Sequence, residues 1–183
     1  MKRIVPNHIV HYSRGEPFCS ITSVSPNQVE RVINGLNEKN AWGINRFSNS
    51  VYYKQRLEVE KAMRSKFIEK GGAPILSHPI YFFLGRNNRF EEHPLNIGYV
   101  IDLSDIDMSS ISFSYGDTML SFNEDNRNLS GEQYENSLCD KLFSFDELND
   151  LFDDKLFPTQ QTLHVEAHLW TQPPLDLVRK LVR

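Results

Sequence analysis

The chain has 183 residues, of which 39% are hydrophobic and 11% aromatic, and its formal net charge is −4 at pH 7. This length suits one globular unit with its own core, so we expect residues 1–183 to form a single domain. No apolar run approaches the roughly 20 residues that span a bilayer, and the basic start lacks an apolar secretion segment. Cys19 and Cys139 have no metal-site spacing and suit a reducing compartment. We therefore expect a cytoplasmic protein without membrane contact.

The charge is unevenly distributed along the chain. Residues 123–155 contain ten acidic and three basic side chains, a local balance of −7, which leaves +3 for the remainder. A negative net charge is unfavourable for holding duplex nucleic acid by phosphate neutralisation alone. The acidic part is either a solvated surface or a face that meets a basic partner.

The first elements expected are a short strand at residues 9–13 and a helix that begins after Ser25. In that helix Ser25 is the N-cap, Pro26 takes the first helical position and Gln28 is placed to close a capping box. Apolar residues then recur at i, i+3, i+4 and i+7, which predicts one face against a sheet. These residues are Val29, Val32, Ile33 and Leu36, and Asn37 can end the helix.

A second helix is expected at residues 51–69, after a loop at 41–50 that is rich in asparagine and serine. Gly71 and Gly72 supply its C-terminal cap. At 100° per residue Tyr52, Val59, Met63 and Phe67 form one narrow apolar stripe, and Arg56 lies inside it. A buried guanidinium without a partner would cost several kcal/mol. Arg56 therefore either pairs with Glu60 one turn later or meets a bound anion such as phosphate or a carboxylate.

The middle of the chain predicts three strands. Residues 79–85 are a continuous apolar run typical of a central strand buried on both faces. Arg86 follows directly, so its guanidinium lies at a sheet edge, where ligand sites form, or in a surface turn. Residues 99–103 and 111–115 predict two further strands in a mostly antiparallel sheet, with a turn at 116–117.

The last third predicts a loop, two helices and one strand. Residues 121–137 are polar and are expected to form a loop or a substrate-facing excursion. Ser144 and Glu147 form a capping box that predicts a short helix at 145–152. Pro173 and Pro174 stop the preceding strand, and residues 175–182 are expected to form a last helix. Neither a glycine-rich phosphate loop nor a paired cysteine motif is present, so classical kinase, P-loop and Rossmann functions are unsupported.

The strand that precedes these prolines, residues 163–170, has the cleanest alternation in the sequence. Leu163, Val165, Ala167 and Leu169 point to one face and belong in a core, while His164, Glu166, His168 and Trp170 point to the other. A carboxylate flanked by two imidazoles is unusual where a strand only needs to be soluble. A solvated outward face remains the common alternative.

A metal site at this strand is disfavoured by its spacing. Alternate residues on a strand lie roughly 6.6 Å apart, so His164 and His168 are about 13 Å apart. Two ligands at that separation do not share one ion at bond lengths near 2.0 to 2.1 Å. We therefore expect no metal.

Three motifs in this order resemble the DarT-type ADP-ribosyltransferase toxins, which transfer ADP-ribose from NAD to a nucleic-acid base. The family's opening strand, His-x-Thr-x-x-x-Asn-Leu-x-x-Ile, is similar to the stretch from His11 and Ser13 to Ile21, with Pro17 at the position of the Asn. The family's helical catalytic Arg is similar to Gln55-Arg56, and its Tyr-Phe strand closed by Arg is similar to the stretch from Tyr81 to Arg86. Its final motif, a Glu followed by a small residue and an apolar pair, is similar to Val165-Glu166-Ala167-His168-Leu169.

The resemblance implies an α+β domain with a split, mostly antiparallel sheet and flanking helices. It also implies a catalytic Glu166 and Arg56, with NAD as substrate and a base of single-stranded DNA or RNA as acceptor. The cofactor-binding residues would be His11, Ser13, Tyr52, Tyr53, Tyr81 and Arg86. A family toxin would also be expected to have an antitoxin partner and a role in phage defence.

The chemistry of the residues agrees with such a role. Cleavage of the bond to nicotinamide passes through an oxocarbenium-like state, whose positive charge a fixed carboxylate stabilises. Glu166 suits this task, His11 could bind ribose, and Tyr52, Tyr53 or Tyr81 could stack on nicotinamide. Arg56 and Arg86 would meet pyrophosphate or orient the acceptor. For His11 a hydrogen-bonded place in the core is an equal alternative. Tyrosines at such positions more commonly contribute to packing than to ligand binding.

Other functions stay open from the sequence. The acceptor could be a DNA base, an RNA base or a protein side chain. A non-catalytic module could bind a partner through the acidic half. RNA 2′-phosphotransferases also act on NAD, but they generally use basic residues where this chain has Glu166.

Overall fold

The computed structural model describes residues 5–38, 50–130, 135–154 and 164–181. Within them, one six-stranded sheet has the order β4-β5-β2-β1-β3-β6, and all neighbouring strands are antiparallel. The strands are β1 His8–Ser13, β2 Ile80–Leu84, β3 Ile97–Asp102, β4 Ile111–Tyr115, β5 Val165–Leu169 and β6 Arg179–Lys180. The α-helices are α1 Pro26–Glu38, α2 Ser50–Glu69, α3 Asn88–Glu91, α4 Thr118–Ser121, α5 Glu124–Ser130 and α6 Phe145–Asp154. Short 3₁₀ turns span Ile21–Ser23, Leu103–Asp105, Met108–Ser110 and Asn136–Leu138. The expected α+β class, with a mostly antiparallel sheet and flanking helices, is confirmed.

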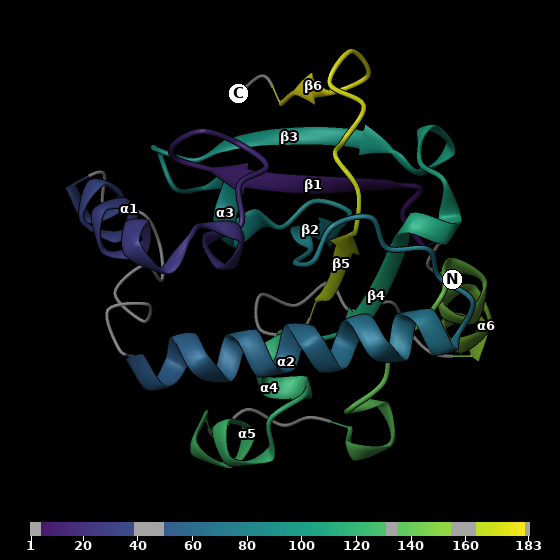
Figure 1. Cartoon of the computed structure of the whole chain (residues 1–183). Coiled ribbons are helices and arrows are strands. Elements are labelled where there is room, and N and C mark those ends of the chain that lie inside the picture. Colours follow the sequence, from purple (N-terminus) through teal and green to yellow (C-terminus); the bar gives the residue numbers. More distant parts are fainter. Residues whose placement is uncertain (1–4, 39–49, 131–134, 155–163, 182–183) are drawn as a thin grey trace.

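The two faces of the sheet carry different side chains. Because β-strand side chains alternate, Val165, Ala167 and Leu169 point to the face where α6 packs through Leu148 and Phe152. The opposite face is covered by α2, which crosses below the sheet in Figure 1 with α4 nearby. There Val59, Met63 and Phe67 pack with Met119, Leu142 and Trp170. The alternation predicted for the described part of residues 163–170 is confirmed.

The long helix α2 follows the sequence closely. It covers the predicted residues 51–69 and one more, Ser50, while residues 41–49 of the predicted loop lie outside the described residues. Gly71 has φ +88°, and the Gly72 N–H donates to the Phe67 carbonyl at 2.9 Å, which closes the helix. None of the described helices combines the length and the apolar composition that a bilayer crossing needs.

Two helix starts were predicted from capping residues. At α6 the box is reciprocal: the Ser144 N–H donates to Glu147 Oε2 at 2.8 Å, and the Glu147 N–H donates to Ser144 Oγ at 3.2 Å. At α1 the helix begins at Pro26 as predicted, but Ser25 Oγ donates to the side-chain oxygens of Asn27 and Gln28 instead.

Two predictions of secondary structure are wrong. Residues 121–137, expected to be a loop, include the helix α5, whose first turn is capped where the Asn126 N–H donates to Asn123 Oδ1 at 2.9 Å. Residues 175–182 were expected to be a helix, but their described part, up to Leu181, contains a turn followed by β6, which pairs with Tyr99 and Val100 of β3. Hydrogen bonds to the backbone at the edge of β3 outweigh the helical spacing of the apolar residues in this segment.

The sheet is split between β1 and β2. From His8 to Ser13 every residue of β1 pairs with β3, but only Ile9 and Val10 pair with β2. The imidazole of His11 spans the gap beyond them. Its Nε2 accepts from the Phe18 N–H at 3.2 Å, so its Nδ1 carries the proton and donates to the Tyr81 carbonyl at 2.8 Å.

Candidate functional site

The sheet face that α2 covers holds two rows of polar and aromatic side chains. The pairing of β4, β5 and β2 aligns Ser112, His168 and Tyr81 in one row, and Ser114, Glu166 and Phe83 in the next. These positions alternate with core residues on the same strands, so all six side chains project towards α2 and α4. Antiparallel register therefore brings together residues that lie more than fifty positions apart in the sequence.

Glu166 is held as a carboxylate at the centre of this face. Its Oε2 accepts from the Thr118 N–H at 2.9 Å and from the Thr118 hydroxyl at 2.5 Å. Burial raises the pKa of Glu166, but electrostatic interactions with the side chains of His164, Arg56 and His168 outweigh it and lower the pKa to about 2. The side chain keeps 14% exposure, and no described residue donates to Oε1 within hydrogen-bond distance. One carboxylate oxygen is therefore fixed and the other is open.

A buried chain of hydrogen bonds ends at this carboxylate. The Thr118 hydroxyl proton lies in the bond to Glu166, so His168 Nε2, 2.8 Å from the same hydroxyl, must be the donor in their contact. His168 Nδ1 is then the acceptor facing Ser112 Oγ at 3.4 Å, and Trp170 Nε1 donates to that Ser112 oxygen at 2.9 Å. His168 is neutral in this arrangement, consistent with burial, which lowers its pKa to about 4.

His164 lies beside the open oxygen of Glu166. Its Nε2 is 3.6 Å from Glu166 Oε1, which is beyond a hydrogen bond, and the ring meets Phe83 edge-on with centroids 4.9 Å apart. Both ring nitrogens are buried and have no hydrogen-bond partner. An orphaned buried imidazole costs about 1–3 kcal/mol, so the local structure retains an unfavourable group next to the carboxylate.

Arg56 reaches the same face from α2. Its Nε donates to Glu60 Oε1 at 2.9 Å, and its guanidinium carbon lies 3.8 Å from the centre of the Tyr81 ring. Burial works against its charge, but Tyr81, Glu60, Tyr52 and Glu166 hold its pKa above the ordinary value. The side chain is 13% exposed. The structure shows the pairing with Glu60 that the sequence offered as one alternative, and Arg56 also interacts electrostatically with Glu166.

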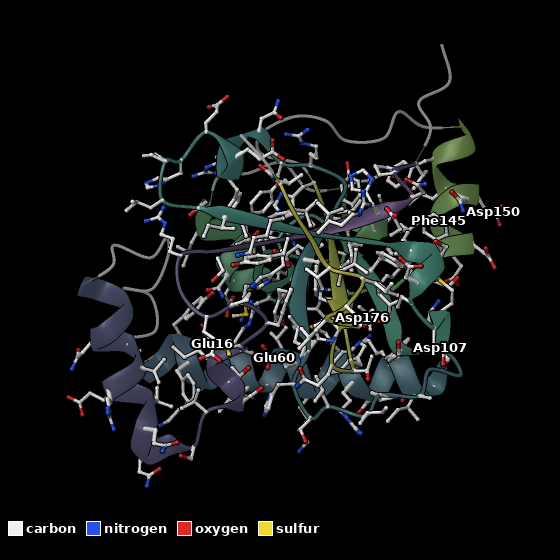
Figure 2. All side chains as sticks on the ribbon, turned by 90° about the horizontal axis from the view of Figure 1, so that it is seen from above. Glu16, Glu60, Asp107, Phe145, Asp150 and Asp176 are labelled. Carbon is white, nitrogen blue, oxygen red and sulfur yellow. The ribbon has the colours of Figure 1, made fainter. Side chains whose placement is uncertain are left out.

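Glu60 is the fully buried member of the site, with 0% exposure. Its Oε1 accepts from the Tyr81 hydroxyl at 3.1 Å as well as from Arg56, and its Oε2 accepts from His78 Nδ1 at 2.7 Å. In Figure 2 Glu60 lies on α2 within the crowded interior, whereas Asp150 lies at the outer edge of α6. Burial raises the pKa of Glu60, but these donors and a hydrogen bond from Thr22 lower it below its ordinary value.

The structure brings together only some of the residues proposed from the sequence. Glu166, Arg56 and Tyr81 share one face, with the Tyr81 ring edge-on to His168 at 5.3 Å between centroids. Tyr52 packs against the apolar cluster of Val59, Met63 and Phe67. Tyr53 is half-buried on the same helix.

The other proposed residues have structural partners. Both nitrogens of His11 are hydrogen-bonded across the strand split, which matches the alternative of a satisfied core histidine. Ser13 bonds within its own turn, to Gly15 and Glu16. Arg86 is 57% exposed and forms an ion pair with Glu91. None of these three contacts Glu166 or Arg56.

Sequence reasoning missed Thr118 and Asp117 as members of the site. Asp117 caps α4 through bonds from the Met119 and Leu120 N–H groups. Burial and the charge of Glu166 raise the pKa of Asp117, so a second carboxylate with the opposite pKa shift lies beside the first. The Gly116-Asp117 pair predicted a turn, but only the β4–β5 register shows that this turn faces Glu166.

Among the described residues no group of three or more His, Cys, Asp and Glu side chains is arranged to hold a metal ion. Comparison of the chain with protein-family models, curated proteins and solved structures gives no match.

Proposed function

We propose that this chain is an NAD-dependent ADP-ribosyltransferase that modifies a nucleic-acid base, as a toxin or defence enzyme. The observation that carries the proposal is the state of Glu166. Its carboxylate is held ionised by Thr118, keeps one oxygen open, and shares a partly exposed site with the Arg56 cation. A fixed anion beside a fixed cation suits a substrate that combines a developing ribosyl cation with a diphosphate.

The proposed reaction breaks the bond between C1′ of the ribose and the nicotinamide nitrogen. Both bonding electrons leave with nicotinamide, and the resulting oxocarbenium ion is stabilised by the Glu166 carboxylate. A lone pair of the acceptor base forms the new bond to C1′, and the proton that the acceptor loses passes to water. Arg56 holds the diphosphate through its terminal nitrogens.

The acceptor class rests on the resemblance of the three motifs to DarT-type enzymes. A protein side chain is the second candidate acceptor, because the same site chemistry serves either nucleophile. An antitoxin or a hydrolase that removes the modification would be the expected partner in the cell.

The first test measures transfer directly. Purified protein is incubated with NAD and separate pools of single-stranded DNA, RNA and protein, and each pool is examined by mass spectrometry for added ADP-ribose. We expect the modification in a nucleic-acid pool. Modification of the protein pool alone would change the acceptor class, and modification of none would contradict the enzyme.

The second test is Glu166→Gln, which keeps the side chain's shape and removes its charge. We expect transfer to fall at least about a hundredfold while the fold persists, since the carboxylate acts on charge that develops only in the transition state. Circular dichroism checks the fold, and the exposed Glu92→Gln serves as the matched control. A fall of only a few-fold would count against the assignment.

A further inference from the structure

We infer that Glu60 is a positioning residue that fixes the guanidinium of Arg56 for the diphosphate of the substrate. This inference rests on the proposed function and extends it to a buried side chain that does not itself meet substrate. Sequence reasoning considered Glu60 only as the partner of a surface ion pair. Its complete burial and its set of donors give it a different place in the molecule.

The carboxylate of Glu60 is engaged by donors within the protein. Its Oε1 accepts from Arg56 and Tyr81, and its Oε2 accepts from His78. An ionised carboxylate offers about four acceptor positions, so these three donors take most of its capacity. Because the side chain is 0% exposed, substrate has no access to the remainder. Glu60 is therefore not a second catalytic carboxylate, and its effect on the reaction passes through a neighbour.

Arg56 is the neighbour of Glu60 that still has hydrogen-bond donors available for a ligand. Its Nε is used by Glu60, and one face of its plane lies on the Tyr81 ring. Within the described residues no hydrogen bond involves Nη1 or Nη2. The guanidinium is thus fixed at one edge and one face, and the edge that remains is the two-nitrogen fork that binds pairs of anionic oxygens.

The contacts of Glu60 come from separate parts of the fold. His78 precedes β2, Tyr81 lies in β2, and Arg56 is one turn earlier on α2. The two donors outside α2 hold the Glu60 carboxylate against the sheet. The orientation of Arg56 is therefore tied to the sheet that carries Glu166, which is what transfer at a defined geometry requires.

The experiment is a double-mutant cycle on transfer. Glu60→Gln, Arg56→Ala and the double variant are compared for kcat/KM with NAD and for the Kd of ADP-ribose, with the exposed Glu58→Gln as control. Gln keeps the length of Glu60 but replaces one acceptor oxygen with a donor. We expect Glu60→Gln to lower kcat/KM and ADP-ribose affinity at least tenfold in the wild-type background, and less than twofold when Arg56 is already absent.

Equal losses in both backgrounds would show that Glu60 acts on the fold in general and would overturn the inference. Because a buried ion pair is being altered, Glu60→Asp is included as a variant that keeps the charge but withdraws it by one methylene. A folded Glu60→Asp with wild-type kcat/KM would likewise overturn the inference. A wild-type chain that neither turns over NAD nor binds ADP-ribose contradicts the proposed function itself, whereas an active Glu60→Gln contradicts only the role of Glu60.

Discussion

Thr118 is the residue that donates hydrogen bonds to the Glu166 carboxylate. It donates twice to one carboxylate oxygen, from its backbone and from its hydroxyl, and the hydroxyl also links Glu166 to His168. Hydrogen bonds to the ionised form of an acid lower its pKa. The residue thus connects the register of β4 and β5 to the charge of the proposed catalytic group.

Thr118→Val tests this connection, because it removes the hydroxyl and keeps both the volume and the backbone donor. The pKa of Glu166, lowered to about 2 in the wild type, should rise towards its ordinary value. The acid limb of the pH profile of kcat/KM should therefore move to higher pH, while activity at neutral pH, where Glu166 is ionised in both proteins, should change little. Thr118→Ser restores a hydroxyl and should restore the profile. An unmoved acid limb in a folded Thr118→Val would refute this role.

Candidate site residues were easier to predict from the sequence than their partners. Glu166 was singled out because two imidazoles flank it on an alternating strand, and Arg56 because it lies inside an apolar helical stripe. In the structure both side chains lie on one face. Glu60 looked like an ordinary i,i+4 partner, because its burial depends on Tyr81 and His78, which follow about twenty residues later. Arg64, one turn further along α2, donates to the carbonyls of Pro74 and Leu76 and so has a local structural task.

At the scale of elements, the correct predictions are those that depend on interactions between residues close in sequence. The capping box at Ser144 and the glycine stop at Gly71 involve residues close in sequence, and both predictions are confirmed. The helix predicted at 175–182 is wrong for the opposite reason. Its apolar spacing suits a helix, but the edge of β3, which is distant in sequence, supplies strand hydrogen bonds instead. The helix α5 had a readable signal, since Asn123 precedes two acidic residues at its start.

Two glycines in or next to helices should respond in opposite ways to alanine. Nothing lies within 4 Å of a Cβ added at Gly35 in α1, whereas one added at Gly72 after α2 would lie 2.5 Å from the ring of Phe67. Gly35→Ala should stabilise the protein by about 0.5–1 kcal/mol, because alanine loses less backbone entropy in a helix. Gly72→Ala should destabilise it by at least about 1 kcal/mol, because Phe67 must leave its place against Trp170.

Urea denaturation of both variants measures these changes. The midpoint should rise for Gly35→Ala and fall for Gly72→Ala, with little change in the slope. Two shifts of the same sign would contradict the packing assigned to Phe67.

At the scale of the whole molecule, stability should fall as the solution becomes acidic. His168 is neutral in the folded protein, with a pKa lowered from 6.5 to about 4, so the unfolded chain binds a proton between these values and the folded chain does not. The stability from this group is present above pH 6.5 and is lost as the pH falls to about 4. The loss is about 3 kcal/mol. Glu166 extends the same trend from its ordinary pKa of 4.5 down to about 2.

Comparison of the wild type with His168→Gln isolates this contribution. The free energy of unfolding, measured in urea at pH 7 and at pH 4, should change less in the variant than in the wild type. His11, whose pKa is also lowered by burial, remains in both proteins and preserves part of the slope. Parallel curves for the two proteins would exclude His168 as a source of acid sensitivity.

The two edges of the sheet bear on how the protein behaves at high concentration. The outer side of β4 exchanges two hydrogen bonds of 2.9 Å between Phe113 and Phe143, and the other edge is β6, only two residues long. Both β6 residues, Arg179 and Lys180, are exposed cations. Short, charged or covered edges offer a neighbouring chain few unpaired amide and carbonyl groups to extend. The strand that replaces the expected last helix therefore shields the sheet from edge-to-edge aggregation into fibrils.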